Sequence, residues 1–176
     1  LTSQSPKSDE YNEHAHDEML FIIVHQAYEL WFKQIIHELG SVLDMFCKEN
    51  IDEKNIGVAV SRLRRITTIQ RLLIDQLNVL ETMTPLDFLE FRDFLIPASG
   101  FQSFQFRLIE NMMGLNIENR VKLDEKNYYS LVSDEHQKML LDSQNTVSLF
   151  DAVDKWLSRI PFLKIDSFDF WEHYKN

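Results

Sequence analysis

Two pairs of residues combine an aromatic ring with a polar group four positions further along the chain. Phe21 and His25 form the first pair, within a strongly apolar run, and Phe88 and Arg92 form the second. Residues four apart share one face of an α-helix, with Cβ atoms about 5–6 Å apart. A neutral imidazole in an apolar pocket can hydrogen-bond a small ligand, and a guanidinium can hold a carboxylate through two parallel hydrogen bonds. Each pair is therefore a candidate ligand contact.

Each pair also has a purely structural explanation. His25 could be a core histidine whose ring bonds a backbone carbonyl, and Arg92 could form an ion pair with Asp87 or Glu90. The apolar residues around His25 already suffice for a core stripe without it, which favours a ligand role. The residue types and their spacing leave both explanations open.

A turn beyond the second pair offers further polar groups. Ser99 and Gly100 follow Pro97 and would present a hydroxyl and exposed backbone N–H groups to a small anionic or zwitterionic ligand. The run His14–Glu18 has the composition of a metal-binding tract, although acids and histidines at a helix start are usually solvated. The sequence contains no CxxC, HExxH, P-loop, GxGxxG or GxSxG pattern.

The composition is that of a folded, acidic domain. The 176 residues include 18 Lys and Arg against 28 Asp and Glu, a net charge of −10, and 44% of them are hydrophobic. This balance argues against nucleic acid as the main partner, because that binding depends on clustered positive charge. We also expect no membrane partner, since no apolar run approaches the roughly 20 residues of a membrane helix. The single cysteine, Cys47, favours a reducing, cytoplasmic location.

Long helices are expected to position both pairs. The four glycines and four prolines fall where helices should begin or end, so the sequence predicts an all-α bundle of long amphipathic helices. Apolar residues recur at intervals of three and four from about 17 to 39 and from about 53 to 81. Residues 42–46 either extend the first helix or form a short second one. The first of the two long helices carries Phe21 and His25.

Further helices are expected after the two long ones. Thr84-Pro85 predicts the start of a short helix that carries the second pair. Ser99 is a candidate N-cap for another helix that ends at Gly114. Residues 133–160 predict one long helix, and the aromatic tail from 165 to 174 is expected to pack against other residues.

Three stretches of the sequence resemble the tryptophan 2,3-dioxygenase family: HDEMLFIIVHQAYELWFKQIIHEL, VLETMTPLDFLEFRDFLIPASGFQSFQFRLIEN and FDFWEHY. The first two are too long and specific to arise by chance. The resemblance runs through essentially the whole chain but covers only the N-terminal half or so of a family member. It implies that residues 1–176 form a single all-α region of a haem dioxygenase.

The resemblance implies roles for both pairs in one pocket. Phe21 would line an indole pocket, and the imidazole of His25 would hydrogen-bond the indole N–H, as an orienting group rather than an obligatory general base. Arg92 would bind the substrate carboxylate, and the turn at Ser99 and Gly100 would lie beside the haem and the substrate ammonium group. The substrate-binding residues implied in this way are Phe21, Ile22, Ile23, Val24, His25, Phe88, Arg92, Ser99 and Gly100.

The reaction implied by the resemblance adds both atoms of O₂ across the indole C2–C3 bond of L-tryptophan. The product is N-formylkynurenine, the first intermediate of the kynurenine pathway, and the cofactor is haem b. In the family, the proximal histidine that binds the iron belongs to the C-terminal half, and no histidine here matches it. We therefore expect this chain to supply the distal pocket, to hold no metal ligand itself, and to need the C-terminal half for turnover. The family is homotetrameric and cytosolic.

A rival hypothesis is a non-catalytic helical interaction module that retains the family pattern. Retention of both pairs favours the enzyme, because a binding module needs no aromatic ring and polar group on each of two helices. The sequence begins at Leu1 rather than Met. We therefore expect the remainder of the polypeptide to be a separate chain or a segment outside this sequence.

Overall fold

An all-α architecture extends through the part of the chain that the structure describes. The computed structural model describes residues 3–48, 51–96, 102–120, 132–159, 164–165 and 168–169. Its helices are α1 (Lys7–Glu10), α2 (Glu18–Phe46), α3 (Glu53–Leu80), α4 (Pro85–Phe91), η1 (Arg92–Leu95), α5 (Phe104–Met113), η3 (Ile117–Asn119), α6 (Asp134–Gln144) and α7 (Leu149–Ser158). Two short antiparallel strands, β1 (Lys164–Ile165) and β2 (Phe168–Asp169), are also described. The predicted fold class is confirmed.

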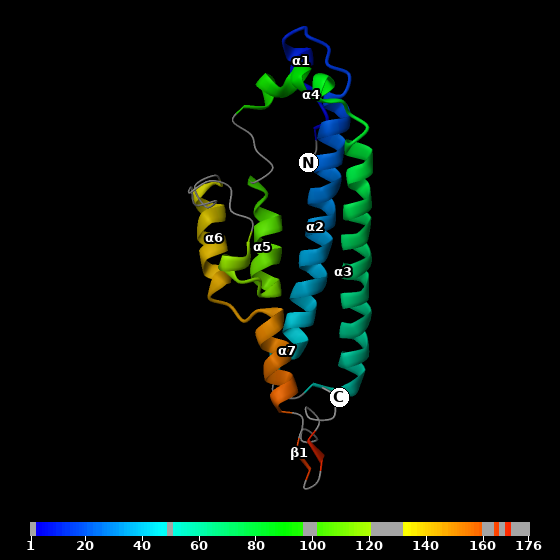
Figure 1. Ribbon diagram of the computed structural model, residues 1–176. Coiled ribbons are helices and arrows are strands. Elements are labelled where there is room, and N and C mark those ends of the chain that lie inside the picture. Colours follow the sequence, from blue (N-terminus) through cyan, green and yellow to red (C-terminus); the bar gives the residue numbers. More distant parts are fainter. Residues whose placement is uncertain are drawn as a thin grey trace.

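Two long antiparallel helices form the axis of the molecule. In Figure 1, α3 runs along one side of α2, and α5 and α7 lie on the other. Apolar residues of α2 and α3 meet in a core that includes Ile35, Leu39 and Ile66, and Tyr28 Oη donates to the Leu73 carbonyl oxygen at 2.5 Å. The predicted long helices are confirmed, and the stretch 42–46 continues α2 without a break. None of the described helices is both long and apolar enough to span a membrane.

The start of α5 differs from the prediction. The helix begins at Phe104, and its N-cap is Ser103, whose Oγ accepts a hydrogen bond from the Phe106 N–H at 3.2 Å. The prediction of Ser99 as the cap was therefore wrong, and Ser99 itself lies outside the described residues. The Ser103 hydroxyl also donates to Glu29 on α2, a tertiary contact that the local sequence does not reveal.

The single helix predicted for residues 133–160 was wrong, because the structure has two. A helix begins here as predicted, with Ser133 as the N-cap of α6, but α6 ends at Gln144 and α7 begins at Leu149. Ser148 and Asp151 form a capping box: Asp151 N–H donates to Ser148 Oγ at 3.2 Å, and the Asp151 carboxylate accepts from the Ser148 N–H at 3.2 Å. Apolar residues keep a helical spacing on both sides of this break, so the sequence pattern does not indicate that the helix is interrupted.

A close approach joins the end of α5 to the start of α7. Gly114 ends α5 in the left-handed conformation, with φ of 85°. A Cβ atom at Gly114 would lie only 2.6 Å from Ser148 Oγ. The position therefore requires glycine for both its backbone conformation and its lack of a side chain.

A buried carboxylate joins the two long helices. The Glu38 side chain of α2 is 5% exposed, pairs with Arg65, accepts from Gln34 Nε2 at 2.8 Å, and lies 3.7 Å from Arg62 Nε. Burial raises the pKa of Glu38, but the hydrogen bonds from Arg65 and Gln34 and the charges of Arg65 and Arg62 lower it more. The net result is a pKa below the ordinary value of 4.5.

Acid is expected to weaken this junction. Because the pKa of Glu38 is lower in the folded than in the unfolded chain, its contribution to stability is complete above the unfolded value of about 4.5. That contribution is lost as the pH falls through the lower, folded value. The free energy of unfolding, measured by urea titration from neutral pH to about pH 3, should converge with that of Glu38→Gln only at the acidic end. A difference between the two proteins that stays constant with pH would contradict this assignment.

Candidate functional site

Four aromatic side chains meet where the first turns of α2 face α4. The Phe21 ring centroid lies 4.0 Å from that of His25, 5.8 Å from Phe88 and 5.5 Å from Phe91. Phe88 and Phe91 pack edge to face at 5.4 Å. We call Phe21, His25, Phe88 and Phe91 the aromatic cluster. The structure thus brings the first predicted pair into contact with the aromatic member of the second.

A capping box sets the position of Phe88 on α4. Thr84 Oγ1 accepts from the Asp87 N–H at 3.3 Å, and the Asp87 carboxylate accepts from the Thr84 N–H at 2.8 Å and its hydroxyl at 2.6 Å. The bond from the Thr84 hydroxyl, with a smaller contribution from the Thr84 backbone N–H, holds the pKa of Asp87 below its ordinary value. The predicted start of this helix is confirmed, and the Asp87 carboxylate is committed to the cap.

The half-buried ring of His25 has one nitrogen engaged and one available. Nδ1 lies 2.7 Å from the Phe21 carbonyl oxygen. Because a carbonyl oxygen only accepts hydrogen bonds, Nδ1 must carry the proton, and Nε2 of the neutral ring is then an acceptor. No residue in the described part of the chain hydrogen-bonds Nε2. The backbone contact expected of a core histidine is present, yet it also orients the ring with a free acceptor for a ligand.

Arg92 lies at the junction of α4 and η1, on the protein surface. The structure describes both Asp87 and Glu90, and it pairs Arg92 with neither. The purely structural explanation of Arg92 was therefore wrong. None of the described acidic residues pairs with the exposed Arg92 guanidinium.

Three other predicted substrate-binding residues, Ile22, Ile23 and Val24, are not members of the aromatic cluster. Val24 is buried in the core, Ile23 is exposed, and Ile22 is half-buried. Successive residues of an α-helix point about 100° apart, so Ile23 points away from Phe21, while Ile22 and Val24 lie on either side of it. Ser99 and Gly100 lie outside the described residues. The roles of all five stay predictions.

The sequence analysis missed Phe91 as a member of the aromatic cluster. Its side chain is fully buried and contacts both Phe21 and Phe88. The spacing of three between Phe88 and Phe91 could have indicated that both rings face the same neighbour.

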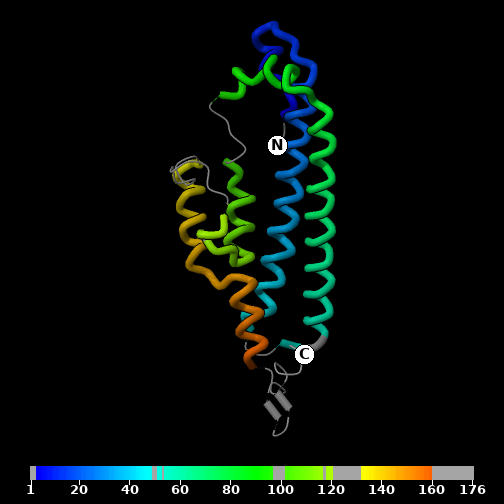
Figure 2. The backbone as a smooth tube through the Cα atoms, viewed as in Figure 1, coloured from blue at the N-terminus to red at the C-terminus, as the bar shows by residue number. Residues whose placement is uncertain are grey.

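The N-terminal segment contacts the helix turn that carries Arg92. Glu18 is buried, and its carboxylate accepts from the backbone N–H groups of Lys7 at 2.6 Å and Ser8 at 2.9 Å. Tyr11 then stacks on Phe94 of η1, with ring centroids 5.1 Å apart. Figure 2 shows this segment and α4 together at one end of α2. No local signal in the sequence indicates that Glu18 is buried.

The acidic and histidine-rich run at the start of α2 has structural partners. His14 Nδ1 lies 2.7 Å from Asp9, while Glu18 holds the backbone of α1. Within the described ranges, no three His, Cys, Asp or Glu side chains are grouped so that they could hold a metal ion. The described residues therefore supply a cluster of aromatic rings with an imidazole acceptor, and an exposed guanidinium on the helix turn that follows α4.

Comparisons with known proteins show the family of this chain. The model of a family described as tryptophan 2,3-dioxygenase matches residues 1–176. A tryptophan 2,3-dioxygenase from Bdellovibrio bacteriovorus is 55% identical over 99% of this chain and 49% of its own length. Those from Alteromonas mediterranea and Dictyostelium discoideum are 50% and 49% identical over the whole chain and 49% and 44% of their own lengths. The chain spans about half the length of these relatives. It belongs to the tryptophan 2,3-dioxygenase family.

Proposed function

We propose that residues 1–176 form the distal, substrate-facing half of a haem-dependent tryptophan 2,3-dioxygenase. The assembled enzyme adds both atoms of O₂ to the indole ring of L-tryptophan and gives N-formylkynurenine. The observation that carries this proposal is the Nε2 atom of His25, which no described residue hydrogen-bonds and which lies within the aromatic cluster. The relatives, which are named tryptophan 2,3-dioxygenases, support the same reaction.

The site residues suit the two ends of tryptophan. An indole is a flat apolar ring with one N–H donor, which the rings of Phe21 and Phe88 and the Nε2 acceptor of His25 complement. The guanidinium of Arg92 suits the carboxylate at the other end, because its fork can make two parallel hydrogen bonds. A site built on hydrogen bonds discriminates strongly against ligands that lack the matching groups. Ser99 and Gly100 remain proposed contacts for the substrate ammonium group.

The residues of the aromatic cluster suit the substrate side of a haem pocket. They combine apolar rings with one neutral imidazole and include no carboxylate. Haem b, when bound, supplies the iron chemistry that activates O₂. Phe21 and His25 would lie on its distal side, and the proximal ligand would come from the C-terminal half of the polypeptide. The role of His25 is to orient the indole N–H, and that of the rings is to exclude water.

The assembled enzyme is proposed to be a homotetramer located in the cytoplasm.

Replacement of His25 by alanine tests the orienting role. In the assembled enzyme, loss of one hydrogen bond worth about 1–1.5 kcal/mol should lower kcat/KM for L-tryptophan by roughly tenfold. The half-buried ring contributes little to the core, so thermal stability should change little. Steady-state kinetics and thermal unfolding of the variant measure these two effects.

Two controls sharpen this test. The native enzyme should prefer L-tryptophan to 1-methyltryptophan, which has no indole N–H, and His25→Ala should reduce that preference. His37→Ala changes an exposed histidine of the same helix and should leave both kinetics and stability unchanged. A large loss of stability with normal turnover would instead establish His25 as a core residue.

The rival interaction module makes a different prediction about cofactor content. A visible absorption spectrum of the assembled protein, taken together with intact mass, should show a Soret band and both halves of the polypeptide. An assembly that contains both halves but never acquires haem would support the module.

A further inference from the structure

Arg92 lies just beyond a bend in the backbone, on a turn that α4 does not simply extend. Phe91 has φ of −121° and ψ of −3°, whereas a residue inside an α-helix has φ near −63°. One backbone hydrogen bond, from the Arg92 N–H to the Phe88 carbonyl oxygen, crosses this bend. The turn η1 that follows has only four residues, Arg92–Leu95. The position of the Arg92 guanidinium therefore depends on what η1 packs against.

The N-terminal segment supplies such a contact. After α4, which precedes it in the chain, the described element with the most extensive contact to η1 is α1, and both lie at the same end of α2 (Figure 1). Tyr11, which directly follows α1, stacks on Phe94 with ring centroids 5.1 Å apart and an interplanar angle of 20°. Phe94 is half-buried and lies two residues after Arg92. The ring of Tyr11 thus restrains the turn that carries the guanidinium.

Hydrogen bonds tie the backbone of Tyr11 to the start of α2. The Tyr11 N–H donates to the Ser8 carbonyl oxygen at 3.1 Å, and the Ser8 N–H donates to the buried Glu18 carboxylate at 2.9 Å. The buried Ser8 hydroxyl also accepts from the Ala15 N–H at 3.3 Å, which closes the loop between α1 and α2. Glu18 lies three residues before Phe21, on the same side of α2. Tyr11 is therefore anchored to the helix face that carries the first ring of the aromatic cluster.

We propose that Tyr11 is a positioning residue for Arg92, an inference that rests on the proposed function. The two polar groups that would hold tryptophan lie on different elements, His25 on α2 and Arg92 on η1. The loop that ends in Tyr11 connects these elements, so it sets the separation of the imidazole from the guanidinium to suit the two ends of one substrate. Tyr11 is 64% exposed, so its ring contributes little to the core and acts mainly on the orientation of η1.

Ligand binding to the assembled enzyme tests this role without turnover. In calorimetric titrations in the absence of O₂, Tyr11→Ala should raise the Kd of L-tryptophan about fivefold, the size expected from one aromatic pair. The Kd of tryptamine, which has no carboxylate, should stay at the native value. Tyr11→Phe keeps the stacked ring and should bind both ligands like the native enzyme. The double variant Tyr11→Ala/Arg92→Ala should bind L-tryptophan as weakly as Arg92→Ala alone, because the restrained group is then absent.

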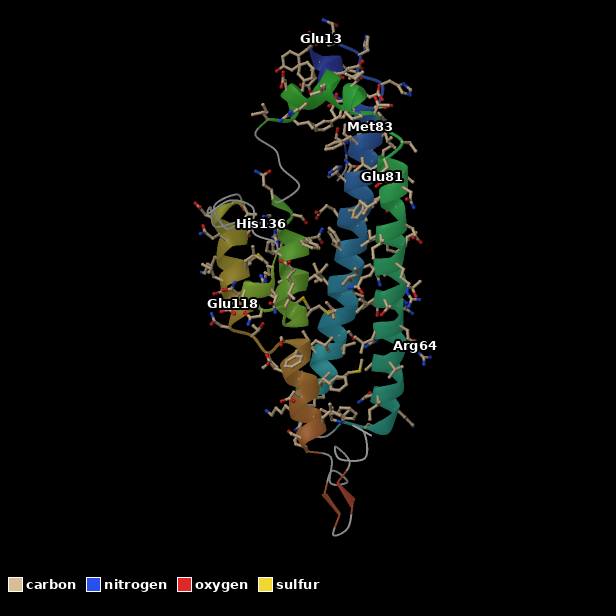
Figure 3. All side chains as sticks on the ribbon, viewed as in Figure 1. Glu13, Arg64, Glu81, Met83, Glu118 and His136 are labelled. Atoms are coloured by element: carbon tan, nitrogen blue, oxygen red, sulfur yellow. The ribbon has the colours of Figure 1, made fainter. Side chains whose placement is uncertain are left out.

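Glu13→Ala is the matched control in the same loop. Glu13 is exposed (Figure 3), and its replacement should change neither Kd. The positioning role is overturned if Tyr11→Ala weakens both ligands equally, if Glu13→Ala has the same effect, or if the losses of Tyr11→Ala and Arg92→Ala add in the double variant. It is also overturned, with the proposed function intact, if Arg92→Ala weakens L-tryptophan selectively and Tyr11→Ala does not. If Arg92→Ala itself has no selective effect, the carboxylate contact on which both proposals depend is wrong.

Discussion

Replacing Arg92 by alanine is expected to lower kcat/KM for L-tryptophan about 100-fold in the assembled enzyme, mainly by raising KM. A charge-assisted pair of hydrogen bonds to a carboxylate contributes roughly 1.5–3 kcal/mol, which corresponds to about 10- to 150-fold in binding. Arg92 is exposed and pairs with neither of its acidic neighbours, so its removal leaves no buried group without a partner. Steady-state kinetics should show the loss while the free energy of unfolding stays near the native value.

A substrate without a carboxylate is the decisive control for Arg92. Tryptamine has the same indole ring, so the native enzyme and Arg92→Ala should process it equally poorly. Arg92→Lys keeps the charge without the planar fork and should fall between the two proteins with L-tryptophan. Arg64→Ala removes an exposed arginine that projects from α3 (Figure 3) and should have no effect. An equal loss with tryptamine and tryptophan would contradict the carboxylate role.

The largest expected loss of stability follows from replacing Glu110 by alanine. Glu110 is buried on α5, and its Oε2 lies 2.8 Å from Arg107 Nη1 and 3.8 Å from Arg120 Nη1, both on buried side chains. Removing the shared carboxylate takes one close acidic partner from each of two buried guanidinium groups. Breaking a buried ion pair from one side typically costs about 3–5 kcal/mol. Urea unfolding should show a decrease of that size.

Glu118→Ala provides the matched control for this prediction. Glu118 is an exposed acid on η3 (Figure 3), so its loss should change the free energy of unfolding by less than about 0.5 kcal/mol. Arg120, one of the two partners of Glu110, also donates from Nη2 to the Asn111 side-chain oxygen at 2.7 Å, and Asn111 donates to Ser143 Oγ at 2.7 Å. Loosening of the contact between α5 and α6 should therefore accompany the loss of Glu110. Equal stability of the two variants would mean that the buried charges do not depend on this carboxylate.

Short-range signals in the sequence predicted the elements that hold the site. The apolar spacing of three and four predicted α2 and α3, and Thr84 with Pro85 predicted the start of α4. Both kinds of signal depend on neighbours within one or two helical turns, which the sequence contains in full. The spacing of Phe21 and His25 likewise requires that they share a helix face.

The sequence predicted helix ends wrongly where a residue far away in the chain determines which serine caps the helix. Ser99 and Ser103 are both plausible helix caps, and Ser103 also bonds Glu29 on α2. The break between α6 and α7 lies where Ser148 meets Gly114 at the end of α5. Neither Glu29 nor Gly114 is near these serines in the sequence, so the local pattern alone could not select the correct cap.

The sequence by itself determined the helices, the two ring-and-polar pairs and the resemblance to one family, because each depends on residue type and short spacing. Only the tertiary structure showed that Phe91 joins the rings of the two pairs, that the proton on Nδ1 leaves Nε2 of His25 as an acceptor, and that Glu18 is buried. The contact of Phe91 with Phe21 and the burial of Glu18 against α1 form only when separate helices pack together, and the bond of His25 to the Phe21 carbonyl depends on the side-chain rotamer, which residue spacing does not specify.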